Sequence, residues 1–165
     1  MTAVEIRIED DHTVISTATA DGESNEWVVP CGMASLSRRH FSTDPPLPED
    51  LTNAIGEVID HLDDAIRELP WLAAANTVVV SGPCARTIAA VEHGAVIGTA
   101  TFELSRDAAE DVFRTLATEP INDRRHNPGL PLAHAETIVA GCCAMVALIR
   151  CLHLDTVTIA MSANA

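Results

Sequence analysis

Apolar and charged residues alternate over residues 4–9 (VEIRIE), at the start of the chain. This period of two is typical of a strand with one buried face. Residues 10–12 (DDH) follow as a turn, and a second strand is predicted over residues 13–19. Beyond a turn at residues 21–22, a third extended segment is predicted over residues 26–30. The chain is therefore expected to begin with an antiparallel meander.

The hydrophobic period lengthens in the next part of the chain. Residues 32–41 are predicted to form a short helix or turn, and residues 42–46 (STDPP) interrupt it. An amphipathic helix is then predicted from Pro48 to the residue before Pro70, because proline suits a first helical turn and acidic residues follow it. The apolar residues of this helix recur every three to four positions, at Leu51, Ile55, Val58, Ile59, Leu62, Ile66 and Leu69.

A strand, a turn and a helix follow one another closely in the middle of the chain. Residues 77–80 are a short β-branched run, Ser81-Gly82-Pro83 is a turn, and residues 85–91 have a helical pattern. This sequence of elements is typical of a buried parallel strand. The remaining predicted elements are a further extended segment, a helix capped by Ser105, a polar loop, a central helix and a last buried strand, at residues 97–102, 105–116, 124–131, 135–152 and 156–161.

These elements predict an α/β fold with three layers around a mixed sheet. The chain has 165 residues, of which 47% are hydrophobic and 21% are charged. One domain commonly holds about 150 residues, and this composition supports a buried core. We therefore expect a single domain over residues 1–165.

Charge and cysteine content narrow the classes of function. The 24 acidic residues outnumber the 10 basic ones, all of them arginine, and the net charge of −14 repels nucleic acids and anionic lipids. The longest apolar stretch, residues 138–152, contains Arg150 and is shorter than the about 20 residues of a membrane span. Five cysteines without a C-x-x-C pair, and no apolar leader, indicate reduced thiols. We expect a cytoplasmic protein that binds neither nucleic acid nor membrane.

Several segments, taken in order, carry a resemblance to a known family. They are residues 5–6 (EI), 32–37 (GMASLS) with 43–46 (TDPP), 81–90 (SGPCARTIAA), 131–141 (PLAHAETIVAG) and 155–160. They resemble the D-x-G-G-G-S-T-E loop, the G-x-x-R-L-T and S-D-P-P segments, the S-G-T-A-R-T-L-A-A segment, the R-A-D-x-I-x-x-G helix and the strand after it in exopolyphosphatase / guanosine pentaphosphate phosphohydrolase (Ppx/GppA) phosphatases. The resemblance covers the second lobe of that family and implies a ribonuclease-H-like fold of the actin-like ATPase superfamily, with the order βββ-α-β-α-α-α-β.

The family hydrolyses phosphoanhydrides in a cleft between two lobes, where the first lobe supplies a glycine-rich loop and a glutamate that orients water, with Mg²⁺ assisting. We expect this chain to begin inside a strand, with residues 1–4 where glycines and a serine would lie. Ser35 and His134 stand in place of arginines, and Pro83-Cys84 in place of a threonine. These differences remove positive charge and donors where a polyphosphate would bind. The chain is therefore expected to have no catalytic residue and no cofactor, unless a cleft is completed in trans with Mg²⁺.

The turn at Gly82 is the candidate phosphate site. The backbone N–H groups of Cys84 and Ala85, together with Arg86, would face a phosphate at the start of a helix. The alternative is a tight turn without a ligand. Cys84 is interpreted as a packed thiol rather than as a thiolate activated by the helix.

Two basic clusters have the same sequence, Arg-Arg-His, at residues 38–40 and 124–126. The candidates for contact with a polyanion or an acidic partner are Arg38, Arg39, Arg124, Arg125 and His134. The simpler interpretation is solvated loops with local ion pairs. The acidic and histidine residues at 10–12 and 60–64 lack the spacing of a known metal site, so no metal is expected there.

Three functions stay open at this point. The first is a single Ppx/GppA-like lobe that is inactive alone and buries a surface near Trp27, Gly82 and Ile159 against a second copy or a separate first-lobe protein. The second is a hydrolase of polyphosphate or pppGpp whose cleft is completed in trans. The third is a non-enzymatic module that senses polyphosphate or a guanosine alarmone.

Overall fold

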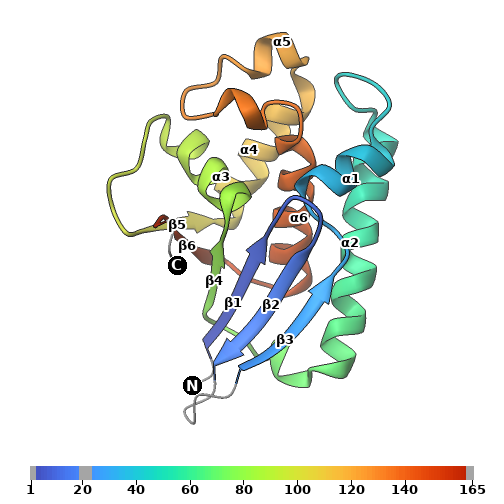
Figure 1. Ribbon diagram of the computed structural model, residues 1–165, viewed down its shortest axis with the longest axis vertical. Helices are drawn as coiled ribbons and strands as arrows, with labels where there is room; N and C mark the ends of the chain where they lie inside the picture. Colours follow the sequence, from blue (N-terminus) through green and yellow to red (C-terminus); the bar gives the residue numbers. More distant parts are fainter. Residues whose placement is uncertain (1–2, 19–23, 163–165) are drawn as a thin grey trace.

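The alternating residues at the start of the chain form the middle of a six-stranded sheet (Figure 1). The computed structural model describes residues 3–18 and 24–162. Neighbouring strands β1, β4 and β6 are parallel, and the pairs β1–β2, β2–β3 and β5–β6 are antiparallel. In the sheet order β3-β2-β1-β4-β6-β5, the strands are β3 (Ser24–Val29), β2 (Thr13–Ala18), β1 (Ala3–Ile8), β4 (Val78–Ser81), β6 (Thr156–Ala160) and β5 (Thr101–Ser105).

The helices begin and end where local chemistry favours it. Pro48 opens the longest helix, with Glu49 and Asp50 in its first turn. The Ser105 side chain accepts a hydrogen bond from the N–H of Ala108 and so caps the helix that begins at Arg106. The helices are α1 (Met33–His40), α2 (Pro48–Glu68), α3 (Pro83–His93), α4 (Arg106–Thr118), α5 (Ile121–Arg124) and α6 (Ile138–Cys151), with 3₁₀ turns η1 (Pro70–Leu72) and η2 (Leu132–His134).

The predicted central helix is confirmed as α6. Every residue from 138 to 149 is buried, and α1, α2, α3 and α4 all pack against this helix. A β-carbon at Gly141 would lie 2.5 Å from the Cys84 sulfur and 3.3 Å from Met33, so glycine lets α3 and α1 approach closely. All five cysteines are free thiols. Among the described residues, no helix combines the length and the apolar character that crossing a membrane requires.

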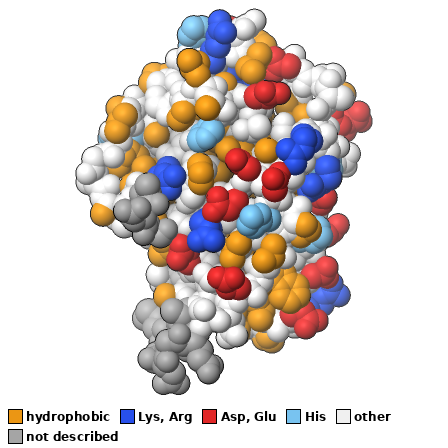
Figure 2. Space-filling model, viewed as in Figure 1, with side chains coloured by type: hydrophobic (Ala, Val, Ile, Leu, Met, Phe, Trp, Pro, Cys, Tyr) orange, Lys and Arg blue, Asp and Glu red, His pale blue; other side chains and the backbone are white. Residues whose placement is uncertain are grey.

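The helices lie on one face of the sheet, which corrects the expectation of three layers. In Figure 1, α6 lies behind the strands and α2 runs beside β3, and the residues that face the helices include Ile6, Ile15 and Val80. Within residues 3–18 and 24–162, no helix covers the other face, which we call the open face. Acidic, basic and hydrophobic side chains are interspersed on it (Figure 2). The strand register places on it Glu5, Ser16, Glu26, Val79, Glu103 and Thr158.

The prediction of a partner surface near Trp27, Gly82 and Ile159 is wrong about two of these residues, because their side chains face the core. Ile159 is fully buried, and Trp27, which pairs with Ile15, points to the same covered face. Trp27 is only partly exposed and packs against the core. These two side chains therefore belong to the interior, and it is the open face that offers a surface.

Several boundaries differ from the predicted ones. The extended segment predicted at 97–102 is β5, and it begins later because the residues before Thr101 form a loop. The predicted polar loop at 124–131 overlaps the end of α5. The first strand agrees with the prediction, since Val4 lies in β1, which also includes Ala3. Met1, Thr2 and the predicted turn at 21–22 lie outside the described residues.

Candidate functional site

The carboxyl ends of β1, β3 and β4 lie at the same edge of the sheet (Figure 1). β4 is parallel to β1, and β1 and β3 each pair antiparallel with β2. In open α/β sheets, ligands bind in the crevice outside the carboxyl ends of the strands. The candidate site therefore consists of the three connections at this edge: residues 9–12, residues 30–32 and residues 82–83.

The turn at residues 9–12 caps helix α1 with its own backbone. The N–H of Met33 donates to the Glu9 carbonyl at 2.9 Å, and the N–H groups of Ala34 and Ser35 donate to the Asp10 carbonyl at 2.8 and 3.0 Å. A β-carbon at Gly32 would lie 2.5 Å from the Glu9 oxygen, so only glycine permits this approach. The donors that a helix start would offer to an anion are taken up by the protein itself.

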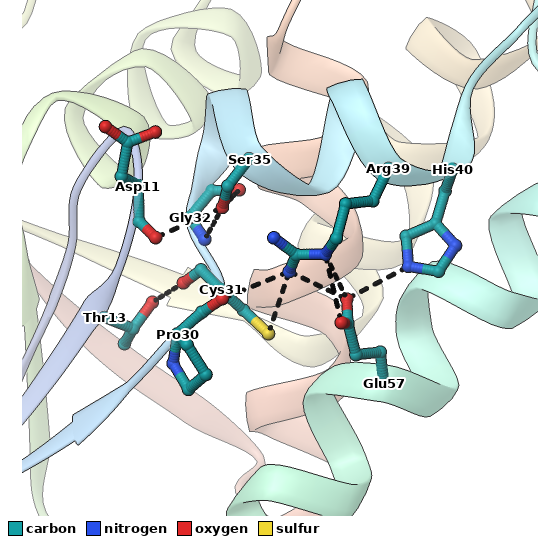
Figure 3. A network of polar contacts seen from close by, with 9 residues as sticks. All are labelled: Asp11, Thr13, Pro30, Cys31, Gly32, Ser35, Arg39, His40 and Glu57. Carbon is teal, nitrogen blue, oxygen red and sulfur yellow. Dashed lines mark hydrogen bonds and ion pairs between the residues drawn. The ribbon is translucent and has the colours of Figure 1, made fainter.

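Side chains reinforce this contact (Figure 3). The Ser35 hydroxyl accepts a hydrogen bond from the N–H of Gly32 at 2.8 Å and donates to the Asp11 carbonyl at 3.2 Å. Arg38 and the Asp11 carboxylate form an ion pair of 2.7 Å, with both side chains about two-thirds exposed. The predicted cation Arg38 therefore has an acidic partner within the same chain.

The Gly82 turn starts helix α3 under tight steric limits. Gly82 has a φ of 97°, and a β-carbon there would lie 2.8 Å from the Ile8 carbonyl oxygen. Pro83, the first helical residue, has no N–H to offer. Cys84 and Ala85 are fully buried. Phosphate binding at this turn stays a prediction. The N–H groups that would bind the phosphate belong to Cys84 and Ala85, which are buried.

Cys84 is a packed thiol, as the sequence suggested, and not an activated thiolate. Burial raises the pKa of the Cys84 thiol well above its ordinary value, and the charges of Cys142 and Asp10 raise it further. The negative charge of Asp10 thus acts on the first turn of α3. An anion at this position would meet that carboxylate, whereas the helix dipole would favour the anion.

Arg39 belongs to a second polar cluster, which joins the end of β3 to α1 and α2 (Figure 3). Its guanidinium donates to the Glu57 carboxylate at 2.9 and 3.1 Å, to the Pro30 carbonyl at 3.1 Å, and to the Cys31 sulfur at 3.6 Å. His40 Nε2 lies 3.0 Å from the same carboxylate. Glu57, which the sequence analysis did not single out, is the acceptor that both basic residues share.

The pKa values of Glu57 and Cys31 in this cluster are shifted in opposite directions. Burial would raise the pKa of Glu57, but the hydrogen bonds from Arg39 and His40, with their charges, outweigh it and lower the pKa. Burial, together with the charge of Glu57, raises the pKa of Cys31 to about 12. Near neutral pH, Glu57 is therefore a carboxylate and Cys31 a thiol.

The remaining candidate cations lie in different surroundings. Arg124 is 2% exposed and donates to the carbonyls of Leu116, Ala135 and Glu119 and to the Asp44 carboxylate. Its neighbour Arg125 is exposed. The two Arg-Arg-His clusters have separate acidic partners, so the structure gives each its own local ion pairs.

Arg86 and His134 are the predicted residues that line one cavity together. The cavity has a volume of about 320 Å³ and lies between the start of α3, η2 and the chain after β6. Thr87 also lines it, and its hydroxyl lies 2.8 Å from His134 Nδ1. Arg86 and His134 belong to separate segments of the family resemblance, residues 81–90 and 131–141, and the fold brings the two side chains to one cavity.

Comparison with known proteins establishes the fold. No family model matches the sequence, and a search of curated proteins finds no match. Among solved structures, the chain is similar to an exopolyphosphatase-like protein (TM-score 0.86, 15% identity). It is also similar to the Ppx/GppA phosphatase of Aquifex aeolicus (TM-score 0.81, 16% identity) and to an exopolyphosphatase from Cytophaga hutchinsonii (TM-score 0.75, 14% identity).

These matches cover 96% of this chain but only 53–55% of the other chains. The chain therefore spans about half the length of these proteins, as one lobe. The expected α/β fold with a mixed sheet is confirmed, and it is the fold of one lobe of Ppx/GppA phosphatases.

Proposed function

We propose that this chain, which has the fold of one Ppx/GppA lobe, does not hydrolyse phosphoanhydrides by itself and acts by binding a companion protein. The observation that carries the proposal is the turn at residues 9–12. Its carbonyl oxygens accept hydrogen bonds from the first N–H groups of α1, and three of its four side chains are acidic.

Phosphoryl transfer depends on positioned donors and cations around the transferred group. A phosphate loop supplies backbone N–H groups, and glycines let the backbone approach the ligand closely. The turn here has the sequence Glu-Asp-Asp-His and contains no glycine. It directs carbonyl oxygens toward α1, and the charge of Asp10 raises the pKa of Cys84 at the start of α3. A polyphosphate would therefore meet negative charge at the edge where these strands end.

A phosphate-release assay tests this proposal. The purified chain is incubated with polyphosphate or pppGpp and Mg²⁺, beside an active exopolyphosphatase as positive control. We expect release equal to that of buffer alone. Release that increases with the amount of the chain, and that stops when Mg²⁺ is chelated, would contradict the proposal. Repeating the assay with a first-lobe protein added tests the alternative that a cleft is completed in trans.

The open face supports a companion other than a second copy. Glu5, Glu26 and Glu103 lie on this face and outnumber Arg7, which lies there too, so two copies facing each other would mainly bring like charges together. A companion with basic groups would be attracted instead. Sedimentation of the chain alone is expected to give a monomer at physiological salt. Val28 of β3 is an exposed hydrophobic residue on the open face, and a dimer that Val28→Arg dissociates would favour self-association.

The cavity beside Arg86 and His134 favours a second candidate, the sensing of a phosphate-containing ligand. It offers a cation, an imidazole and the Thr87 hydroxyl at one place. Calorimetric titration with polyphosphate and with pppGpp tests this candidate. If it holds, Arg86→Ala abolishes the binding heat, whereas Arg67→Ala, which removes an exposed arginine paired with Asp64, leaves it unchanged. Absence of heat with both ligands removes the candidate.

A further inference from the structure

Three side chains with different metal-binding atoms come together beside the carboxyl end of β3. The Cys31 sulfur, a Glu57 carboxylate oxygen and a His61 ring nitrogen all lie within 4.8 Å of one another. Cys31 is fully buried, and the other two side chains are partly exposed. The cluster is therefore reached from solvent on the α2 side and closed on the side of the sheet.

The backbone around the cluster is held firmly. The Thr13 hydroxyl donates to the Cys31 carbonyl at 2.7 Å, and the N–H of Cys31 donates to the Val29 carbonyl at 2.8 Å. Glu57 and His61 are four residues apart on α2, which places them on the same face one turn apart. The buried neighbours Val58 and Leu62 pack this helix into the core. Helix α2 and the hydrogen-bonded connection after β3 thus set the positions of all three side chains.

We propose that Cys31, Glu57 and His61 bind a divalent transition-metal ion of the zinc class. Zinc takes thiolate, imidazole and carboxylate ligands at about 2.0–2.3 Å in a tetrahedral arrangement, which holds ligand atoms about 3.3–3.8 Å apart. The three atoms must therefore approach by about 1 Å, within the reach of small side-chain rotations. Three protein ligands leave the fourth position to water. A thiolate and an imidazole select such an ion over Mg²⁺.

Arg39 is the competitor of this ion. Its guanidinium contacts both Glu57 and Cys31, so it occupies the charge-compensating position that a metal ion would take. The Arg39 side chain is 39% exposed and can turn into solvent. On binding, the Cys31 thiol releases its proton to water and the thiolate becomes a ligand. His40 stays hydrogen-bonded to Glu57 and orients that carboxylate from outside.

The site is distinct from the candidate phosphate sites. Residues 10–12 and 60–64 lack metal-site spacing when each is taken alone, and His61 finds its partners elsewhere in the chain. The binding of a metal ion here requires no phosphate ligand and no hydrolysis. The proposal can therefore fail or hold independently of the proposed function.

Titration of the reduced full chain with Co²⁺, followed by displacement with Zn²⁺, tests the proposal. We expect one Co²⁺ per chain, with a sulfur-to-cobalt charge-transfer band that Zn²⁺ removes. Cys31→Ser should abolish the band, and Glu57→Gln and His61→Ala should weaken binding by more than the about 10- to 100-fold that loss of a residue orienting a ligand costs. Arg39→Ala should strengthen binding by removing the competitor.

Two variants serve as matched controls. Cys151→Ser removes a partly exposed thiol that lies beside Asp63, also on α2, and should leave the band unchanged. Arg38→Ala removes the neighbouring arginine, which pairs with Asp11 instead. Circular dichroism of each variant verifies the fold, and His61→Ala, at a partly exposed position, gives a result even if Cys31→Ser unfolds. Absence of a band in the unmodified chain, or a band that persists in folded Cys31→Ser, would overturn the proposal. Unchanged affinity in Arg39→Ala would overturn the exchange with the guanidinium.

Discussion

The tripeptide Arg-Arg-His occurs at residues 38–40 and again at residues 124–126, and the structure uses the two copies differently. In the first copy, at the end of α1, the arginines are partly exposed and pair with carboxylates. In the second copy, Arg124 is almost fully buried and donates mainly to backbone carbonyls. Identical residues thus form surface ion pairs at one place and fix three chain segments at another. The role of an arginine follows from the groups that the fold brings to it.

Replacement of Arg124 should have the largest effect. Arg124→Ala is expected to lower the free energy of unfolding by about 3–5 kcal/mol, because it leaves buried carbonyl oxygens and the Asp44 carboxylate without their donor. Urea unfolding measures the loss. Arg125→Ala, at the exposed next position, is the control and should change stability by less than about 0.5 kcal/mol. Equal effects of the two variants would remove the contrast between the copies.

Acid should weaken the first copy through Glu57. Because the pKa of Glu57 is lowered in the folded protein, its contribution to stability is present above the ordinary value of about 4.3 and is lost as the pH falls through the lower folded pKa. Glu57→Gln is expected to cost about 1 kcal/mol at pH 7. Unfolding measured from about pH 6 to pH 3 should show a smaller decrease in the variant than in the unmodified chain. Parallel curves would mean that the Glu57 carboxylate does not contribute.

Arg39→Ala should have a smaller effect than Arg124→Ala, about 0.5–1 kcal/mol, because its partners Glu57 and Cys31 keep some access to water or to His40. The stability of Arg39→Lys should lie between that of the unmodified chain and that of Arg39→Ala, since an ammonium group keeps the charge but cannot reproduce the two-pronged contact with Glu57. Thermal unfolding ranks the three proteins. A loss as large as that of Arg124→Ala would show that partial exposure does not separate the two arginines.

Arg38→Ala should have the smallest effect. Arg38 and Asp11 are both about two-thirds exposed, so their ion pair is worth at most about 0.5 kcal/mol and is screened by salt. The difference from the unmodified chain should disappear at about 1 M NaCl, where the screening length is about 3 Å. A difference that persists at this salt concentration would indicate a role beyond charge pairing.

Local patterns predicted much of the fold. The alternation over residues 4–9 became β1, the apolar stripe after Pro48 became α2, and the apolar segment beginning near residue 135 became α6. β5 was placed a few residues too early, and a second helical layer was expected where the described residues have none. Layer number depends on the directions of the crossovers between strands, which hydrophobic periodicity does not encode.

The polar clusters were beyond the reach of sequence patterns. Cys31 and Glu57 are separated by a helix and a loop, and the contact of the 9–12 turn with α1 depends on Gly32, whose importance is steric. The spacing of Glu57 and His61 was a usable signal, because residues four apart share a helix face. The burial of Arg124 had no local signal, since its acceptors are carbonyls that every residue possesses.

Because helices pack on one face of the sheet, residues that are needed for packing alternate along each strand with residues that are not. Along β1, every second residue is fixed by packing against helices, while the residues between them are free of that requirement. Substitutions at Glu5, Glu26 or Glu103 can therefore change the charge of the open face without disturbing the packing that keeps the protein folded. Such an arrangement allows new binding specificities to arise by surface mutation on an unchanged scaffold.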